Sequence, residues 1–224
     1  MKQKTIWKKL LIITLIVVGA VILACAAALI LLEVRTNAVL DDFSSVYENE
    51  KYRKKVAADN VEVITQDVSC GYAVIEMFSA WDGKSITEES LYSEYGKVVT
   101  STGQAFCNEM NKQFPEYTTT MHKYLSNTEL LDKVYDSLSN GVPVPFEWAA
   151  LYNDDWTLHY SLITSIDIPN DEITVANPYG YYETISLNDF LERTSFEAYS
   201  DMPLYFKLAF AFGIFEKNTI FTAE

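Results

Sequence analysis

The longest apolar run of the chain lies near its N-terminus. Leu10–Leu32 are 23 consecutive residues without a charge. At about 1.5 Å per residue, a helix of this length crosses a hydrocarbon core of roughly 30 Å. The charges before this run are four lysines, at positions 2, 4, 8 and 9. By the positive-inside rule, we expect residues 1–9 to be a basic cytoplasmic stub and residues 10–32 a single-pass transmembrane anchor. Everything after Leu32 is then expected outside the cell membrane.

Two other interpretations of this run stay open. A cleaved signal peptide has an apolar stretch of about 7–15 residues that ends in a small-residue cleavage site. The sequence Ile22-Leu23-Ala24-Cys25 also looks like a bacterial lipoprotein box, in which Cys25 would carry the lipid. The run is longer than a signal peptide needs, and seven apolar residues follow Cys25 where a polar tether is usual. An uncleaved membrane anchor is therefore the favoured prediction.

Residues 33–60 are polar and mixed in charge, but a few apolar positions recur at helical spacing. Val39, Phe43 and Val46 follow this period. The pattern predicts a partly helical juxtamembrane stalk that either stands clear of the membrane or packs on the domain. Residues 61–224 are long enough to form one domain with its own core.

The first half of this domain has the apolar period of helices. Ala73, Val74, Met77 and Phe78 share one face of the first predicted helix. Thr87 is a plausible N-cap, and Gly141 stands in the usual C-cap place. The helices predicted in this half are residues 70–81, a helix that begins after Thr87, residues 103–113 and residues 128–140.

The second half changes to the composition of strands. Four segments are rich in β-branched and aromatic residues and are bounded by Pro, Asn, Asp or Gly. These predicted strands are residues 142–151, 157–168, 172–176 and 181–185, and a short helix over 187–194 follows them. Helices first and an antiparallel sheet afterwards indicate an α+β fold. The apolar tail, residues 203–215, either packs on the core, which we favour, or touches the membrane surface beside the anchor.

The net charge of the chain limits the classes of partner that it can bind. The formal net charge is −14, so nucleic acid is an improbable partner, because phosphate binding needs a basic surface. The four lysines are the only charges up to Leu32, so the 192 residues after it carry a net charge of −18. An acidic outer domain favours uncharged or basic partners over acidic ones.

Cys70 is the candidate nucleophile among the three cysteines. Cys25 lies in the apolar run, and Cys107 is expected to be a buried structural thiol; a disulfide between Cys70 and Cys107 stays open. Ser69 is a plausible N-cap, so Cys70 begins an amphipathic helix. A thiol at a helix N-terminus has its thiolate favoured by the helix dipole, as in reactive cysteines.

A thiolate needs a base, and the chain has two histidines. His122 lies in the helical half with no obvious partner. His159 lies near the start of a long predicted strand, and the chain turns back through residues 168–171. If this turn is centred near residue 169 or 170, residues whose numbers add to about 339 face one another. His159 then lies opposite about residue 180, which is Gly180, and within a few positions of Asn177, whose carboxamide could orient the imidazole.

Three segments together carry a resemblance to a known family. They are Thr65-Gln66-Asp67-Val68-Ser69-Cys70-Gly71-Tyr72-Ala73, Trp156-Thr157-Leu158-His159-Tyr160 and Val175-Ala176-Asn177-Pro178-Tyr179-Gly180. Their order and the Asn-Pro-Tyr-Gly phrase after a strand resemble the papain-like cysteine peptidases related to bacteriocin leader-peptide processing enzymes. The resemblance covers roughly residues 61–194. It implies a papain-like fold, hydrolysis of peptide or protein substrates by a thiol, and a bacterial source.

Carried over residue by residue, the resemblance makes Cys70 the nucleophile, His159 the general base and later acid, and Asn177 the residue that holds the imidazole. Gln66 would add a side-chain N–H to an oxyanion hole beside the backbone N–H of Cys70. Two features depart from the family pattern. The third residue is commonly Asp in the bacteriocin-processing group, and only three residues separate Gln66 from Cys70, fewer than in papain. These departures keep open a second hypothesis, a membrane-tethered binding or scaffold protein that retains the fold without turnover.

Other kinds of site have little support in the sequence. The two histidines are 37 positions apart and there is no Cys-x-x-Cys pair, so we expect no metal site. The eight glycines are scattered and form no phosphate loop, so we expect no cofactor. Asp154 and Asp155, just before His159, either border a substrate groove that prefers basic peptides or lie in a solvated loop, which we favour.

Overall fold

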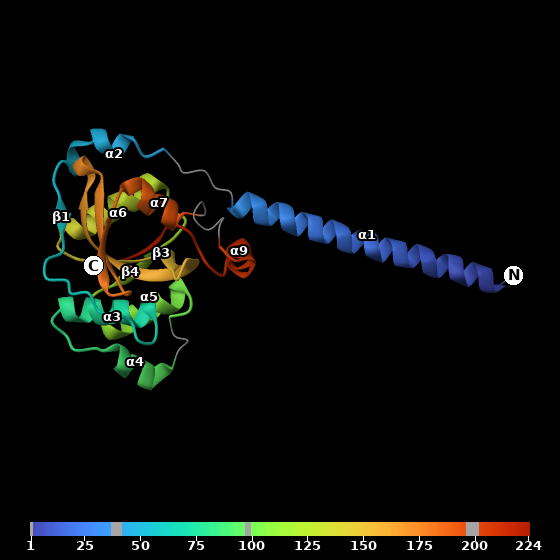
Figure 1. The fold of residues 1–224 in the computed structure, drawn as a ribbon, viewed down its shortest axis with the longest axis horizontal. Coiled ribbons are helices and arrows are strands. Elements are labelled where there is room, and N and C mark those ends of the chain that lie inside the picture. Colours follow the sequence, from blue (N-terminus) through green and yellow to red (C-terminus); the bar gives the residue numbers. More distant parts are fainter. Residues whose placement is uncertain (1, 37–41, 97–99, 196–201) are drawn as a thin grey trace.

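The longest element of the chain is α1 (Lys2–Thr36), a single helix that extends away from the other elements (Figure 1). The computed structural model describes residues 2–36, 42–96, 100–195 and 202–224. Within α1, Trp7–Leu31 form a segment long and apolar enough to cross a membrane, and none of it is buried against the protein. In the described part of the chain this is the one helix that meets both conditions. It overlaps the anchor predicted at residues 10–32.

A seven-stranded antiparallel sheet forms the centre of the domain. Six strands follow the order β2-β7-β3-β4-β5-β6, and β1 pairs with β4 outside this path. The strands are β1 (Val56–Ala57), β2 (Thr119–His122), β3 (Val144–Tyr152), β4 (Asp155–Asp167), β5 (Glu172–Asn177), β6 (Tyr181–Ile185) and β7 (Thr219–Ala223). The four predicted strands correspond to β3, β4, β5 and β6.

Helices lie on both sides of this sheet. In Figure 1, α3, α4 and α5 lie on one side, and α6 and α7 lie on the other. The helices are α2 (Ser45–Glu48), α3 (Cys70–Trp81), α4 (Glu88–Tyr95), α5 (Gly103–Gln113), α6 (Asn127–Ser139), α7 (Leu187–Thr194) and α9 (Leu204–Ala211), with short 3-10 turns η1 (Glu50–Tyr52) and η2 (Ile168–Asn170). The predicted α+β fold is confirmed.

Side-chain caps explain why the helices begin where the sequence predicted. The hydroxyl of Ser69 accepts a hydrogen bond from the backbone N–H of Tyr72 in the first turn of α3. The hydroxyl of Thr87 does the same for Ser90 at the start of α4. Each such bond satisfies one of the N–H groups that have no partner inside the helix. The cap at Ser69 therefore fixes Cys70 as the first residue of α3.

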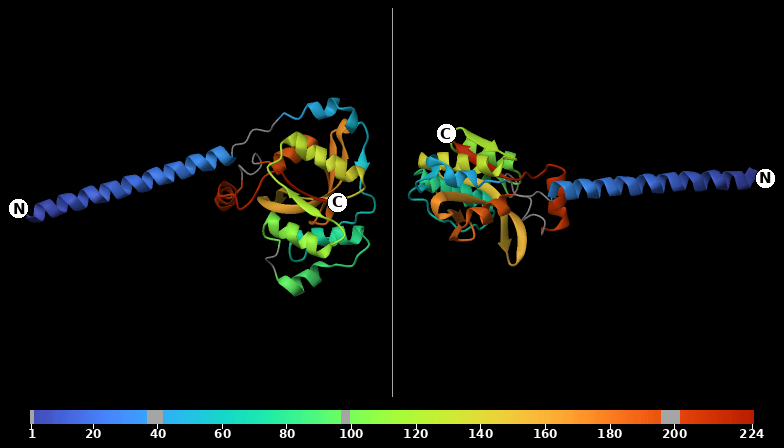
Figure 2. Two further views of the ribbon diagram at one scale, coloured as in Figure 1. Left: turned by 180° about the vertical axis from the view of Figure 1, so that it is seen from behind. Right: turned by 90° about the horizontal axis from the view of Figure 1, so that it is seen from above.

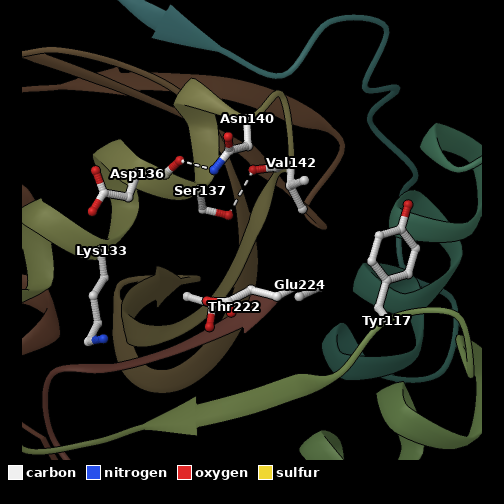
Figure 3. Close-up of a pocket in the computed structure, with 9 residues that line it drawn as sticks. Tyr117, Lys133, Asp136, Ser137, Asn140, Val142, Thr222 and Glu224 are labelled. Atoms are coloured by element: carbon white, nitrogen blue, oxygen red, sulfur yellow. Dashed lines mark hydrogen bonds between the residues drawn. The ribbon is translucent and has the colours of Figure 1, made fainter.

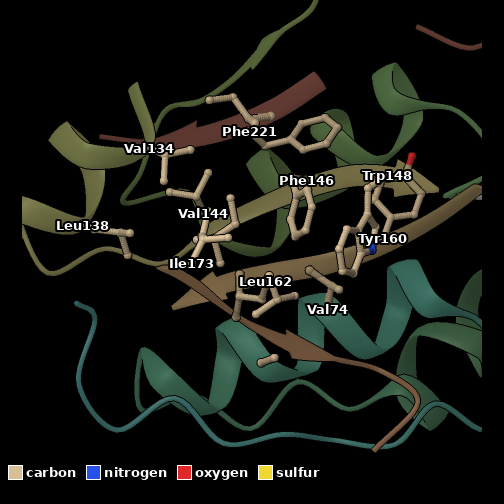
Figure 4. Packing of buried hydrophobic residues seen from close by; sticks show 14 of the residues in the cluster. Val74, Val134, Leu138, Val144, Phe146, Trp148, Tyr160, Leu162, Ile173 and Phe221 are labelled. Atoms are coloured by element: carbon tan, nitrogen blue, oxygen red, sulfur yellow. The ribbon is translucent and has the colours of Figure 1, made fainter. Parts of the chain in front are cut away.

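The main core lies between the sheet and the helices that cover it. Figure 4 shows members of this core, among them Val74 of α3, Phe146 and Trp148 of β3, and Leu162 of β4. All four are 0% exposed. By the strand register, Leu162 lies on the opposite face of the sheet from Phe146 and Trp148. Because α3 packs directly on β4 through this core, the N-terminus of α3 is held next to the strand that carries His159.

The turn between β4 and β5 sets the register of the strands that carry the second and third motifs. Partner residues next to this turn have numbers that add to 339, as predicted. An irregularity between Ile163 and Ser165 lowers the sum to 338 further along the pair. If the pairing with a sum of 338 is extended to His159, the residue opposite it is Tyr179, one position before Gly180.

The juxtamembrane segment packs on the domain from residue 42 on. Val46 is 1% exposed and Tyr52 is 4% exposed, and the Tyr52 hydroxyl donates a hydrogen bond to Asp132 of α6. The strand β1 then pairs with β4. Of the two arrangements predicted for this segment, its described residues have the packed one; residues 37–41 lie outside the described residues.

Besides the two-residue strand β1, two strands, β2 and β7, were not predicted from the sequence. β2 carries His122, so this histidine lies on a strand and not in a helical region, and its Nε2 is 2.9 Å from the Thr222 hydroxyl on β7. β7 lies between β2 and β3 in the sheet. Both strands have only four or five residues, which is too few for a period of two to stand out from the surrounding sequence.

Candidate active site

The thiol of Cys70 lies against the strand that carries His159. Cys70 is partly exposed, and the backbone N–H groups of Tyr160 and Gly71 face its sulfur, where they favour the thiolate. The pairing of β5 with β4 extends only as far as Leu162, so β5 does not cover the edge of β4 beside Tyr160. The backbone N–H of Tyr160 is therefore free to face Cys70 instead of a neighbouring strand.

The imidazole of His159 is held by Asn177. His159 is 2% exposed, and its Nε2 is 3.0 Å from the side-chain oxygen Oδ1 of Asn177. The same oxygen accepts a hydrogen bond from the backbone N–H of Tyr179, and the amide nitrogen Nδ2 donates to Glu183. Since a backbone N–H only donates and a carboxylate only accepts, these two bonds fix the orientation of the amide. Nε2 must then carry the proton, which leaves Nδ1 of His159 as the acceptor.

The carboxylate of Glu183 is held in turn by Arg193 of α7. Nη1 of Arg193 is 2.6 Å from Oε1 of Glu183, and its Nε donates to the carbonyl of Ala149 at 2.9 Å. The guanidinium lies 3.5 Å from the ring centre of Trp148 and is nearly buried. A series of contacts from Arg193 through Glu183 and Asn177 to His159 thus sets the direction of the imidazole.

A tyrosine ring stacks on the imidazole, and a second tyrosine contacts the first at a tilt. The ring centres of His159 and Tyr179 are 4.2 Å apart, with an angle of 20° between the planes. The ring of Tyr152, at the end of β3, lies 5.1 Å from that of Tyr179. Tyr179 covers one face of the imidazole and keeps water from the hydrogen bond between His159 and Asn177.

The first and third motifs also touch each other. The backbone N–H of Gln66 donates to the carbonyl of Pro178 at 2.8 Å. Gly180 has φ +95°, and a Cβ at this position would lie 2.6 Å from the Thr65 hydroxyl. The three motifs therefore contact one another in pairs. Cys70 of the first motif lies against the second, His159 of the second is bonded to the third, and Gln66 of the first is bonded to the third.

The four predicted site residues therefore come from one region of the fold. The side-chain oxygen Oε1 of Gln66 is buried without a hydrogen-bond partner. Gly71, beside Cys70, leaves room for the side chain of Thr100, because a Cβ at position 71 would lie 2.5 Å from it. Thr100, Glu183 and Arg193 were not identified in the sequence. Glu183 follows Asn177 across a tight hairpin, which the alternation of β5 and β6 could have indicated; Arg193 has no comparable signal.

Burial shifts the pKa values of the thiol and the imidazole toward their neutral forms. Burial raises the pKa of Cys70 to about 11, although the backbone N–H groups of Tyr160 and Gly71 oppose the rise. Burial likewise lowers the pKa of His159 to about 4, against the hydrogen bond to Asn177. The helix N-terminus at Cys70 was expected to favour the thiolate, but the loss of solvation has the larger effect here.

The loop before Cys70 depends on Glu88, the first residue of α4. Its carboxylate accepts hydrogen bonds from the backbone N–H groups of Asp67 at 2.7 Å, Val68 at 2.8 Å and Ser69. Glu88 is 5% exposed. The sequence indicated only its favourable place at a helix N-terminus. In the structure it also fixes the segment between Gln66 and Cys70.

A second buried carboxyl group lies close to the thiol. Glu147 on β3 is 1% exposed and pairs in register with Tyr160 of β4. Burial raises its pKa to about 7, which the Tyr160 side chain partly opposes. When Glu147 is ionised, its charge raises the pKa of Cys70 further. A neutral Glu147 therefore favours a reactive thiol.

The other sites considered in the sequence lie apart from this group. Cys25 and Cys107 are free thiols, so Cys70 is not in a disulfide, and Cys107 is 5% exposed. Asp154 is exposed in the turn between β3 and β4. Among the described residues, no group of three or more His, Cys, Asp and Glu side chains could hold a metal ion.

A pocket of about 400 Å³ lies between α6 and β7 (Figure 3). Lys133 and Asp136 of α6 and Thr222 of β7 are among the residues that line it. None of the four predicted site residues is part of its wall. A second pocket, of about 420 Å³, borders Thr65, Asp67 and Glu88 next to the loop that carries Gln66.

Comparison with known protein families gives a match to the domain. The family model described as Peptidase_C39 like family matches residues 58–203, which is more than half of the chain. The matched range includes all three motifs and runs from just before Val61 to the start of α9. No curated protein matches the chain.

We expect Glu88→Ala to destabilise the domain. The substitution leaves three partly buried N–H groups without an acceptor, at about 1–3 kcal/mol for each group that stays unpaired. The loss of unfolding free energy should therefore be at least about 2 kcal/mol, measured by urea unfolding of the full chain in detergent. The exposed neighbour Glu89 is the matched control, and Glu89→Ala should change stability by less than about 0.5 kcal/mol. Equal stability of the two variants would contradict this role of Glu88.

We expect Glu147→Gln to remove a pH dependence of stability. In the folded chain the pKa of Glu147 is about 7, above the value near 4.3 of an unfolded chain. The folded state therefore binds the proton of Glu147 more tightly than the unfolded state does. The contribution of Glu147 to the free energy of unfolding is lost as pH rises from about 4 to 7. The loss is on the order of 3 kcal/mol and is absent from Glu147→Gln. Unfolding of both proteins at pH 5 and pH 8 measures the difference, and the exposed Glu62→Gln should behave as the wild type.

Proposed function

Because the chain belongs to the peptidase C39-like family, we propose that it is a membrane-anchored cysteine peptidase that cleaves peptide bonds through an acyl-enzyme on Cys70. The observation that carries this proposal is the oriented imidazole of His159. Its Nε2 is hydrogen-bonded to Asn177, and hydrogen bonds with Glu183 and Tyr179 fix the amide of Asn177. Nδ1 is then the acceptor that a general base needs.

In the proposed reaction, Nδ1 of His159 takes the proton of the Cys70 thiol as the sulfur attacks the substrate carbonyl. The pKa shifts favour a neutral thiol and a neutral imidazole at rest. Proton transfer therefore accompanies the attack and does not precede it. The imidazolium then protonates the leaving amine, and water hydrolyses the thioester with His159 again as the base.

Asn177 takes the place of a carboxylate in this scheme, so the imidazolium meets an amide oxygen and not an anion. The nearest carboxylate of the series, Glu183, lies behind Asn177 and is paired with Arg193. Asn177 therefore orients His159, but it stabilises the positive charge less than an aspartate would. This favours proton transfer in step with the attack over a stable ion pair.

Gln66 and the backbone N–H of Cys70 would stabilise the oxyanion that forms on the substrate carbonyl. The bond from Gln66 to Pro178 supports this role, because it fixes the backbone of Gln66 beside the third motif. The three bonds to Glu88 hold the rest of the loop in place. A loop held in this way needs no rearrangement as charge develops.

We further propose that residues 10–32 cross the cell membrane, with residues 1–9 in the cytoplasm and the peptidase domain outside. The lysines ahead of the apolar run support this orientation by the positive-inside rule. The net charge of −18 on the outer residues favours uncharged or basic peptide substrates over acidic ones.

A second candidate function is a membrane-tethered binding protein that keeps this fold without turnover. The burial of His159, at 2% exposed, and the pKa shifts of His159 and Cys70 away from their charged forms favour it. The two functions differ in whether His159 changes the reactivity of Cys70.

A peptidyl epoxide should label Cys70 at neutral pH, and Cys70→Ala should abolish the labelling. His159→Ala should slow it by about 10²–10⁴-fold, the usual contribution of a general base. Because burial lowers the pKa of His159 to about 4, the rate should rise through pH 4 and stay level to about pH 9. Mass spectrometry of the full chain measures the rate, and Cys107→Ala is the matched control. The same rate with and without His159 would identify the binding protein.

Gln66→Ala should lower kcat for a cleaved peptide by about 10²–10³-fold with little change in KM, because the lost N–H acts only on the oxyanion. Gln113, on α5, is the control, and Gln113→Ala should keep the wild-type kcat. If Gln66→Ala changes KM alone, Gln66 binds the substrate and is not part of the oxyanion hole.

A further inference from the structure

One end of the domain exposes a group of large apolar side chains. They come from α9 with the turn after it and from the tip of the hairpin between β3 and β4. The exposed members are Leu151, Tyr152, Leu204, Tyr205, Leu208, Phe212 and Ile214, each between 39% and 69% exposed. We call this group the apolar face. The single charge between Leu204 and Phe215 is Lys207.

The apolar face is fixed to the domain by its own small core. Phe210 of α9 is 1% exposed and packs with Ala149 of β3 and Met202. Trp156, at the start of β4, packs against the same cluster. Tyr152 and Tyr205 also line one pocket, so the hairpin tip and α9 are neighbours. The exposed side chains are thus the outer side of a folded element and not a loose tail.

The position of α9 indicates what covers this face. α9 contacts α1, and the views of Figures 1 and 2 agree that it lies beside the C-terminal end of α1. The apolar segment Trp7–Leu31 ends at that level. If α1 crosses a membrane, α9 lies where the chain leaves the hydrocarbon core, and its exposed side chains meet the lipid headgroup region.

We propose that the apolar face rests on the bilayer surface and holds the domain against the membrane. This proposal rests on the membrane crossing of α1 given under the proposed function. A helix with apolar and aromatic side chains on one side and a buried contact on the other is suited to the interface between headgroups and acyl chains. Tyrosine and tryptophan, here Tyr152, Tyr205 and Trp156, favour the same depth.

The docked domain has its thiol site close to the membrane. Tyr152 belongs to the apolar face, and its ring contacts that of Tyr179, which stacks on His159. Two ring contacts therefore separate the lipid-facing surface from the imidazole. A peptide that reaches Cys70 from this side is a segment at the bilayer surface, such as the first residues outside a membrane span.

Photocrosslinking to lipid tests the proposal in the full chain. The chain is reconstituted in vesicles of phosphatidylcholine and phosphatidylglycerol, with benzoylphenylalanine in place of Tyr205 or Phe212. Irradiation should give phospholipid adducts, seen by mass spectrometry, severalfold more often than benzoylphenylalanine at Tyr92. Tyr92 is the matched control because it is also exposed, at 42%, and lies on α4, away from α1 in Figure 1.

Flotation of the vesicles after an alkaline wash separates the possible failures. A chain that floats but gives no more lipid adducts at Tyr205 and Phe212 than at Tyr92 overturns the docking and leaves the anchor intact. A chain that does not float overturns both. Crosslinks to a second copy of the chain in place of lipid would assign the face to a dimer. Labelling of Cys70 in the same vesicles reports on the proposed peptidase separately.

A charge placed on the face gives a second measurement. Leu208→Glu should lower the lipid adducts at Tyr205 severalfold, because an ionised carboxylate does not enter the apolar layer. Gln104→Glu adds the same charge at an exposed position of α5 and should leave the adducts unchanged. Equal thermal unfolding of the two variants shows that the fold is kept. No difference in adducts between them would overturn the proposal.

Discussion

The hydrogen bond between His159 and Asn177 is the interaction on which the candidate site depends. An amide can present either an oxygen or an N–H to the imidazole, and only the oxygen leaves the second ring nitrogen as a base. Glu183 makes this choice, and Arg193 holds Glu183. The protonation pattern of the imidazole is thus set by α7, an element that follows all three motifs in the sequence. Packing of α7 on the sheet is part of the site's chemistry.

The burial that protects this bond also opposes charge at the site. Excluding water strengthens the contact between His159 and Asn177, but it raises the pKa of Cys70 and lowers that of His159. Ionised Glu147 would add to this effect at Cys70. Both shifts favour a neutral thiol and a neutral imidazole at rest, and in the proposed reaction charge develops only as the sulfur attacks a substrate carbonyl. Such an arrangement limits reaction with solvent-borne oxidants, since the thiolate is the reactive form.

Much of the fold could be predicted from the sequence, because local signals decide it. Serine and threonine caps and the helical period located α3 to α6. The turn before β5 gave a register that matches next to the turn and differs by one residue beyond the irregularity at Ile163. The short strands β2 and β7 depend on partners far away in the sequence. For the candidate site, too, only the local signals could be read. Its three motifs could be recognised in the sequence, but the roles of Glu88, Glu183 and Arg193 arise from tertiary contacts and have no local pattern.

The strand β4 connects the candidate site with both segments of the chain that lead to α1, the proposed membrane anchor. At its start, Trp156 packs in the small core that supports α9, and α9 contacts α1. Toward its end, Ile166 pairs with β1, which follows the juxtamembrane segment that leads from α1. At roughly 3.3 Å per residue, His159 is only about 10 Å along the strand from Trp156. A strand held on both sides of His159 cannot turn relative to the anchor without breaking one of these contacts. In the proposed arrangement, with α1 in the membrane, these contacts would fix the direction from which a peptide reaches Cys70, so that position relative to the bilayer selects substrates together with side-chain chemistry.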